Sequence, residues 1–341
     1  MHPGFIRMGV PTMRWIVRNL YVLGVLFGSI SVFSAAPTFA QETTRAWVSG
    51  TGTDQPAPAG VSCTRAQPCQ TFAFAISQTA IGGEINCRDA GGYGTVTITR
   101  SVTIDCAGTT ATILAANSTG VVIDGVGVKV VLRGISINGG HSSSQGVHGV
   151  SFVQGASLTI VDSFIMNFTD ENQGNGISFT PRTNAEMHVV NTVIANNRRG
   201  IYASPTGIGS ANVTLDRVTV ADSIADGLRV STPSRSGAGA YIVANDSTFS
   251  GNGTGVAAVA PAGGNYSVVK LFGSTITSNS GVGVLADGAL VRTDVKDTEI
   301  TNNGTGVSAI NGAILLSYLD NVVDRNGAGG DGSFTGSVSK R

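Results

Sequence analysis

Residues 176–203 contain the pattern that decides the fold. They begin with Gly176-Ile177-Ser178-Phe179, reach Met187-His188-Val189-Val190-Asn191-Thr192-Val193-Ile194-Ala195-Asn196-Asn197 after a variable stretch, and restart at Gly200-Ile201-Tyr202-Ala203. Apolar residues alternate with other residues here instead of recurring every 3.6 positions, and alternation is the periodicity of a strand. The stretch therefore predicts short β-strands separated by turns of Asn, Asp and Gly.

The same pattern recurs through most of the chain. One turn position can be followed from Gly134 to Asp320 in seven steps, which gives a mean period of about 27 residues. Self-similarity at 20 to 50 residues indicates a repeat fold, in which no single copy can bury its apolar face alone. The equivalent residues are Gly134, Asp162, Asn191, Arg217, Asp246, Gly273, Asp297 and Asp320.

Three strand-like pieces and three turns in each copy describe one coil. Stacked coils of equal length pair each strand with its equivalent, in parallel and about 4.8 Å apart. We expect an all-β, right-handed parallel β-helix, a solenoid of about nine to ten three-strand coils over residues 81–326. Alternation then points one apolar column inward (Ile177, Ile201, Leu228, Val256, Val284 and Val307) and another column outward (Ser178, Tyr202, Arg229, Ala257, Leu285 and Ser308).

Other repeat folds do not fit this pattern. The LxxLxLxxN signature of leucine-rich repeats is missing, no copy contains a ten-residue helical stretch, and a propeller blade needs about 40 to 45 residues.

A column of Asn residues is predicted to close one turn of each coil. Asn tolerates left-handed backbone conformations, and stacked Asn amides can bond to one another along the axis. The column contains Asn167, Asn197, Asn252, Asn279, Asn303 and Asn326, with Asp222 in place of Asn once.

Composition excludes two classes of protein. The chain has 341 residues, with 21 Lys and Arg against 21 Asp and Glu, and only 12% of its residues are charged. It has no basic stretch to neutralise phosphates, so we expect no nucleic-acid partner. Since 41% of the residues are hydrophobic, the chain can bury a large core and is not intrinsically disordered.

Residues 1–40 have the order of a secretory signal peptide. Arg14 and Arg18 precede an apolar stretch, 20–33, and small residues lead to Ala40. The apolar stretch is shorter than the roughly 20 residues that a membrane-spanning helix needs. We expect export to the periplasm or the extracellular space and no stable membrane insertion after removal of the signal. Translation can start at Met1 or Met13, and the oligomeric state is left open.

The four cysteines, Cys63, Cys69, Cys87 and Cys106, are predicted to form disulfides, as export favours. Of the three pairings we favour Cys63 with Cys69 and Cys87 with Cys106, because each closes a short loop. A zinc site is disfavoured, since there is no CxxC and no His among them.

Both ends of a coil stack expose strand edges, so terminal caps are expected. Residues 41–80 form the predicted N-terminal cap, with a short helix over 71–78 that buries Phe72, Ala75 and Ile76. The Gly- and Ser-rich segment 327–341 is expected to be a flexible tail.

Together with the repeats, several segments resemble secreted bacterial right-handed parallel β-helix proteins of the pectin-lyase-like superfamily. They are 45–54, the Cys63 to Phe72 segment, 82–87 and 104–106, and the resemblance covers roughly residues 45–326. It implies the fold strongly and the activity weakly, because this superfamily contains polysaccharide-cleaving enzymes, adhesins and other proteins.

The catalytic motifs of these enzymes are missing. Polygalacturonase-like hydrolases would show Asn-Thr-Asp, Asp-Asp, Gly-His-Gly and Arg-x-Lys, and pectate lyases an Arg-x-x-Pro-x-x-Arg; none occurs here. No catalytic residue is assigned. No cofactor is expected, since the recurring Asp residues are explained by turn chemistry and a Ca²⁺ site lacks support.

One surface group remains as a ligand-binding candidate. Arg and Tyr suit sugar acids, through bidentate carboxylate contacts and stacking on a pyranose ring. The sequence favours a non-catalytic module, glycan-binding or structural, at the cell surface or in the periplasm. The alternative is a polysaccharide lyase or glycoside hydrolase with a non-standard site. The candidate residues are Arg198, Arg199, Tyr202, Asp226 and Arg229.

Overall fold

The computed structural model describes residues 42–55, 62–141, 143–233, 237 and 239–339. They lie within one compact unit, residues 39–341. The expected signal peptide, residues 1–40, lies outside the described residues.

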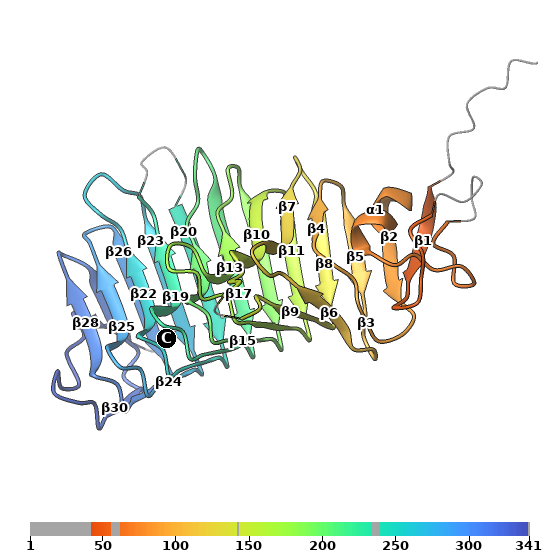
Figure 1. Ribbon diagram of the computed structural model, residues 1–341. Coiled ribbons are helices and arrows are strands. Elements are labelled where there is room, and N and C mark those ends of the chain that lie inside the picture. Colours follow the sequence, from red (N-terminus) through yellow and green to blue (C-terminus); the bar gives the residue numbers. More distant parts are fainter. Residues whose placement is uncertain (1–41, 56–61, 142, 234–236, 238, 340–341) are drawn as a thin grey trace, which may run out of the picture. The chain divides into compact units, whose positions relative to one another are not determined.

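The described strands form three parallel sheets, which we name A, B and C (Figure 1). The chain visits them in the order A, B, C and repeats this circuit nine times, as the nine strands of sheet C show among the described residues. The fold is therefore a right-handed parallel β-helix, as predicted.

Sheet A has the longest strands on average. It contains β1 (Thr43–Val48), β2 (Thr79–Cys87), β5 (Val102–Asp105), β8 (Lys129–Arg133), β11 (Ser157–Val161), β14 (Ala185–Val190), β17 (Ser210–Asp216), β20 (Gly239–Asn245), β23 (Ser267–Phe272), β26 (Val291–Lys296), β29 (Ile314–Ser317) and β31 (Gly336–Ser337).

Sheet B has shorter strands. It contains β3 (Gly91–Gly92), β6 (Ala111–Leu114), β9 (Ile135–Asn138), β12 (Phe164–Met166), β15 (Val193–Ala195), β18 (Thr219–Ala221), β21 (Thr248–Ser250), β24 (Thr275–Thr277), β27 (Glu299–Thr301) and β30 (Val322–Asp324). Sheet C contains β4 (Val96–Ile98), β7 (Thr119–Asp124), β10 (His148–Gln154), β13 (Asn175–Phe179), β16 (Arg199–Ala203), β19 (Asp226–Ser231), β22 (Thr254–Val259), β25 (Val282–Asp287) and β28 (Thr305–Ile310).

The core runs through all coils as stacked apolar columns. The predicted inward column of sheet C is confirmed: Ile177, Ile201 and Leu228 are fully buried, and the later members are buried too. Each buried Val, Leu or Ile contributes roughly 1.5 to 3 kcal/mol relative to an exposed one. Parallel pairing therefore stacks apolar side chains of one coil directly on those of the next.

From β7 onward, a glycine precedes the first inward residue of each sheet C strand, because consecutive coils approach closely there. A Cβ at Gly176 would lie 2.7 Å from the carbonyl oxygen of Gly200, and one at Gly200 would lie 2.6 Å from that of Gly227. Such distances are well below van der Waals contact, so a side chain would push the coils apart. This close packing explains why glycine recurs before the apolar residue of each copy.

In successive coils, one residue of the turn between sheets A and B adopts a left-handed backbone conformation. Asp162, Asn191, Arg217, Asp246 and Asp297 have φ values between 45° and 52°, a region in which Asn and Asp are favoured among residues with a side chain. Glycine takes this place at 134 and 273 with positive φ. The last coil differs, because Leu319 rather than Asp320 adopts positive φ.

The Asn column proves to be two columns, which corrects the sequence-based prediction. The left-handed position between sheets B and C is held by Asn167, Asn196 and Asp222, whereas Asn197 lies one residue later. Asn197, Asn252, Asn279 and Asn303 are buried. The sequence pattern merged the two positions because Asn is common at both.

The buried column forms the predicted ladder of stacked amides. Asn252 Nδ2 donates to Asn279 Oδ1 at 3.1 Å, and Asn279 Nδ2 donates to Asn303 Oδ1 at 2.8 Å. Each of these oxygens also accepts the backbone N–H of the preceding rung, at 2.9 and 3.1 Å. The amides thus satisfy buried polar groups at the corner of each coil.

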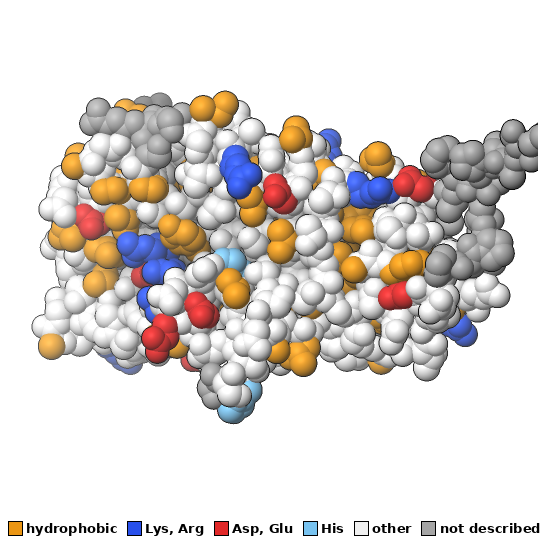
Figure 2. All heavy atoms as spheres, turned by 45° about the horizontal axis from the view of Figure 1, so that its top comes forward, with side chains coloured by type: hydrophobic (Ala, Val, Ile, Leu, Met, Phe, Trp, Pro, Cys, Tyr) orange, Lys and Arg blue, Asp and Glu red, His pale blue; other side chains and the backbone are white. Residues whose placement is uncertain are grey.

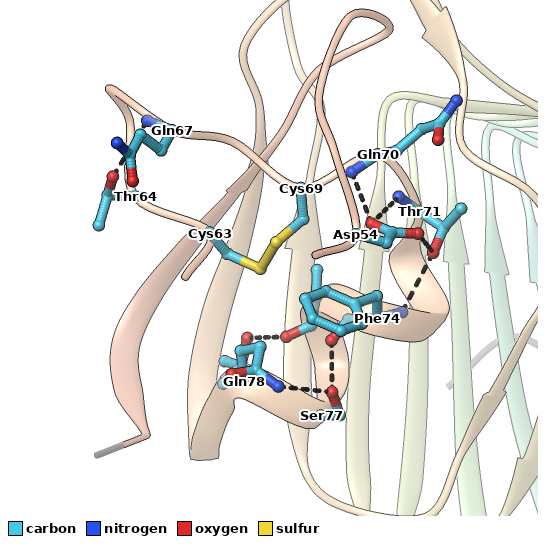
Figure 3. Close-up of a disulfide and its surroundings, with 12 residues drawn as sticks. Asp54, Cys63, Thr64, Gln67, Cys69, Gln70, Thr71, Phe74, Ser77 and Gln78 are labelled. Atoms are coloured by element: carbon cyan, nitrogen blue, oxygen red, sulfur yellow. Dashed lines mark hydrogen bonds between the residues drawn. A yellow bond between two sulfur atoms is a disulfide. The ribbon is translucent and has the colours of Figure 1, made fainter. Parts of the chain in front are cut away.

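The first coil is covered by a short helix, α1 (Phe72–Gln78), which buries the predicted Phe72, Ala75 and Ile76. Thr71 Oγ1 accepts the Phe74 N–H at 3.1 Å, and Asp54 accepts from the Thr71 hydroxyl at 2.7 Å (Figure 3). These bonds satisfy donors at the helix start.

Both predicted disulfides are present, one in the cap and one in the first coils. Cys63 pairs with Cys69, beside the helix (Figure 3), and Cys87 pairs with Cys106. The sequence analysis missed the N-terminal strand β1, which pairs with β2 in parallel and extends sheet A by one strand.

The segment after residue 326 lies against the last coil. The Gly306 N–H donates to Gly330 O at 2.9 Å, Phe334 packs on the core, and β31 pairs with β29. These contacts cover part of the final strand edges. The flexibility of residues 327–341 stays a prediction.

The amide ladder is interrupted at Ser223, which yields a stability prediction. Asn197 Nδ2 and Ser223 Oγ are both buried and have no hydrogen-bond partner in the described part of the chain. Ser223→Asn is expected to raise the free energy of unfolding by about 1 kcal/mol, the typical net value of a hydrogen bond. The neighbouring Gly200 has no side chain and so leaves space for an Asn side chain at position 223, as Gly227 leaves space for the Asn252 side chain.

Urea denaturation of the disulfide-bonded protein measures this change. Ser223→Ala is the matched control and should be nearly neutral, since the hydroxyl has no partner. A Ser223→Asn variant less stable than the wild type would contradict the ladder account.

Tyr93 supplies a second stability prediction, at alkaline pH. Its ring packs on Phe72 with centroids 5.0 Å apart, and its hydroxyl donates to the Asp89 carbonyl. Burial, aided by the Asp89 charge, raises the pKa of Tyr93 to about 12 from the usual 10.0. Because the folded-state pKa is the higher one, stability is intact below pH 10 and falls as the pH rises towards 12.

Tyr93→Phe should remove this fall. The variant starts less stable at pH 8 because the hydroxyl bond is lost, but its urea midpoint should change less between pH 8 and pH 11. If the urea midpoints of the wild type and the variant fall by the same amount between pH 8 and pH 11, Tyr93 does not cause the loss of stability at alkaline pH.

Candidate functional site

Two outward columns of sheet C bring the candidate residues together. In β16, Arg199 and Tyr202 are partly exposed, whereas the residues between and after them are buried. The first and fourth residues of neighbouring strands align in register along the axis. We name the resulting group the sheet C array: His148, Ser151, Asn175, Ser178, Arg199, Tyr202, Asp226 and Arg229.

Asp226 lies between two guanidinium groups. Arg199 Nε donates to Asp226 Oδ2 at 3.3 Å, and Arg229 Nη1 donates to the same oxygen at 3.4 Å. The Asp226 side chain is only 10% exposed, against 23% for Arg199 and 31% for Arg229. A carboxylate this buried needs charged partners. The three side chains together carry one net positive charge, and among the described residues Arg199 bonds this carboxylate through Nε and Arg229 through Nη1.

Tyr202 also contacts the Arg199 guanidinium group. The guanidinium carbon of Arg199 lies 5.6 Å from the centre of the Tyr202 ring, within range of a cation–π contact worth about 0.5 to 1 kcal/mol at exposed sites. Tyr202 is also paired in register with Arg229 on β19. Four of the five predicted residues therefore form one cluster.

Arg198 does not join this cluster in the described contacts. It lies in the turn before β16, where its backbone N–H bonds the carbonyls of Phe168 and Gly174. Its Nε is buried and has no partner among the described residues. The sequence grouped Arg198 with Arg199 by adjacency alone.

Two residues of β13 lie beside the arginine cluster in the register of sheet C. Asn175 and Ser178, which are 4% and 5% exposed, stand between His148 and Ser151 on β10 and Arg199 and Tyr202 on β16. Asn175 Nδ2 donates to His148 Nδ1 at 3.4 Å. Asn175 Oδ1 is buried without a partner in the part of the chain that the structure describes.

His148 is neutral near pH 7 in this position. Burial lowers the pKa of the His148 imidazole below its ordinary 6.5, although the Asp170 charge and the Val147 backbone oppose the shift. An uncharged imidazole can accept the Asn175 N–H at one nitrogen and donate at the other. His148 and Asn175 therefore add polar groups but no positive charge to the sheet C array.

On the face drawn in Figure 2, most of the surface is uncharged. Several Lys and Arg side chains lie together towards the left with acidic side chains beside them, and other charged side chains lie near the middle and towards the right. Hollows of about 530 and 630 Å³ lie elsewhere, beside Phe272 and Lys296 and beside Pro261 and Asp287. The sheet C array lines neither hollow.

The described residues show no group of three or more His, Cys, Asp or Glu side chains that could hold a metal ion. Among the same residues, no helix has the length and apolar character needed to cross a bilayer. The expectations about cofactors and catalytic residues stay predictions.

The sequence analysis missed His148 and Asn175 as members of the group. The signal was present, because each stands directly before the glycine that opens a sheet C strand, as Arg199 and Asp226 do. An alignment of the residues that stand before these glycines would have identified the whole column from the sequence.

Comparison with known proteins supports the fold. No family model matches the chain, and no curated protein sequence matches it. The structure is similar to that of pectate lyase Pel9A, with a TM-score of 0.63 and 14% identity over 88% of this chain and 80% of that one.

Two further structures are more distant. The A-module of mannuronan C-5 epimerase AlgE6 from Azotobacter vinelandii has a TM-score of 0.48 and 15% identity, over 70% of this chain and 68% of that one. Pectin methylesterase PemA from Erwinia chrysanthemi has a TM-score of 0.38 and 12% identity, over 77% and 80%. At such identities the similarity concerns the fold alone. The chain thus has the right-handed parallel β-helix fold of the pectin-lyase-like proteins.

Proposed function

We propose that this protein is an exported, non-catalytic module that binds acidic polysaccharides on the outer face of sheet C. The observation that carries the proposal is the pair of arginines, Arg199 and Arg229, which share one carboxylate on adjacent coils. Two guanidinium groups around Asp226 leave donors and net positive charge for a ligand carboxylate.

Asp226 and Tyr202 act as positioning residues in this proposal. Asp226 holds both guanidinium groups at a fixed separation, and the Tyr202 ring limits the rotation of Arg199. Positioning lowers the entropy lost on binding. The Tyr202 ring edge that Arg199 leaves uncovered can pack on a sugar ring.

Export is supported by two features. Both disulfides are present, and residues 1–40 have the order of a signal peptide. Disulfides persist in oxidising compartments. The periplasm or the extracellular space, where acidic glycans are found, is the proposed location.

The alternative function is a polysaccharide lyase or hydrolase with a non-standard site, favoured by the similarity to Pel9A. Hydrolysis normally needs two carboxyl groups about 5 to 10 Å apart across the scissile bond. Asp226 is the one carboxylate of the sheet C array, and both arginines occupy it. This arrangement favours binding over hydrolysis.

Binding is expected to depend on the arginines. Isothermal titration with acidic polysaccharides should show binding that weakens as salt is raised, and neutral dextran should not bind. Arg229→Ala should weaken binding at least tenfold, since hydrogen bonds to charged groups are worth about 1.5 to 3 kcal/mol. Tyr202→Ala should weaken it by a smaller factor.

Arg217→Ala is the matched control. Arg217 is 58% exposed, pairs with Asp216 in a turn outside sheet C, and its loss changes the net charge equally. Release of unsaturated or reducing ends, measured with and without Ca²⁺ and abolished by Arg229→Ala, would favour the enzyme. Equal losses in both arginine variants would contradict a site on sheet C.

A further inference from the structure

The turns that follow the last strands of sheet C enclose a hollow of about 630 Å³. The strands β22, β25 and β28 are neighbours in this sheet (Figure 1), and each is followed by a turn. Residues of these three turns line the hollow together with Asp287, the last residue of β25. The sheet C array lies on earlier coils, so the proposed function leaves this hollow unused.

The backbone sets the shape of the hollow. Gly288 has a φ of 115°, and a Cβ there would overlap the carbonyl oxygen of Ala260, so position 288 accepts only glycine. On the opposite side, the turn that starts at Pro261 is closed by a bond from the Gly264 N–H to the Pro261 carbonyl at 2.8 Å. The hollow therefore does not depend on the rotamers of long side chains.

Most residues that line the hollow are apolar, and a ligand can reach them from solvent. In the register of sheet C, Asp287 stands between two further apolar residues, Val259 and Ile310. Such a lining with few polar groups suits a ligand with an apolar body. Among the lining residues, Pro261, Ala262 and Ala289 are exposed, whereas Leu290 and Asp287 are half-buried.

Asp287 supplies the only charge of the lining, and among the described residues no basic side chain pairs with it. Asn311 Nδ2 donates to Asp287 Oδ1 at 2.7 Å, which leaves Oδ2 and the Asn311 amide oxygen as acceptors. Arg292, the basic residue nearest in the sequence, bonds Asp294 at 2.9 Å instead. A carboxylate beside an apolar wall is stabilised by a cation that it can contact.

We propose that this hollow binds a small organic cation with an apolar body, such as an amine or an amidine. The N–H groups of the cation donate to Asp287 Oδ2 and to the Asn311 amide oxygen, and the apolar body packs against Leu290 and Pro261. Acidic glycans are excluded, because Asp287 repels a carboxylate. The inference goes beyond the proposed function, since it names a second site for a ligand of opposite charge.

Benzamidine and benzamide are matched probes for this site, because they have similar shapes and only benzamidine is charged at pH 7. Titration of the ¹⁵N-labelled protein should shift the amide signals of Gly288, Ala289 and Leu290. Benzamidine should bind at least tenfold more tightly than benzamide, the scale expected of hydrogen bonds to a charged group. Equal affinities, shifts confined to other residues, or no binding of either probe would overturn the inference and leave the proposed function standing.

Asp287→Asn isolates the charge. An amide at position 287 can still accept the Asn311 N–H, so the thermal midpoint should be unchanged, while the preference for benzamidine should fall below about threefold. Asp297→Asn is the matched control, since Asp297 is exposed in a turn between sheets A and B and its loss changes the net charge equally. The control should keep the tenfold preference. An equal loss in both variants would contradict a cation site at Asp287.

Discussion

Register between coils is the constraint on which this molecule depends. Each residue pairs with its equivalent on the next coil, as in the β13 to β16 pairing of Ile177 with Ile201. At about 4.8 Å, this pairing stacks apolar side chains in the core and forbids a side chain at Gly176 and Gly200. It also aligns the buried amides at the corner, where Asn279 bonds both neighbouring rungs.

The same register builds the outer face of sheet C. The residue before the glycine changes from coil to coil, while the glycine after it keeps the coils close. His148, Asn175, Arg199 and Asp226 occupy this position in four consecutive coils. Later coils carry Thr254 and Thr305 there instead, so the polar cluster is local. A repetitive scaffold thus carries one non-repetitive patch.

The sequence predicted the coils, the inward column and both disulfides, because each follows from a period or a short loop. It placed Asn167 and Asn197 in one column, because the sequence alone does not distinguish a left-handed turn residue from a buried one at the next position. It grouped Arg198 with Arg199 for a similar reason. The burial of Asn175 and Asp226 depends on the side chains of neighbouring coils, which only the stacked strands reveal.

The central claim is that sheet C, and not sheet A, is the ligand-binding face. A crystal structure of the disulfide-bonded protein with a bound uronate-containing oligosaccharide tests it most directly. We expect a ligand carboxylate within hydrogen-bond distance of Arg199 or Arg229, with the sugar rings crossing β13, β16 and β19. Ligand density on sheet A or in the loops between sheets C and A would contradict the account.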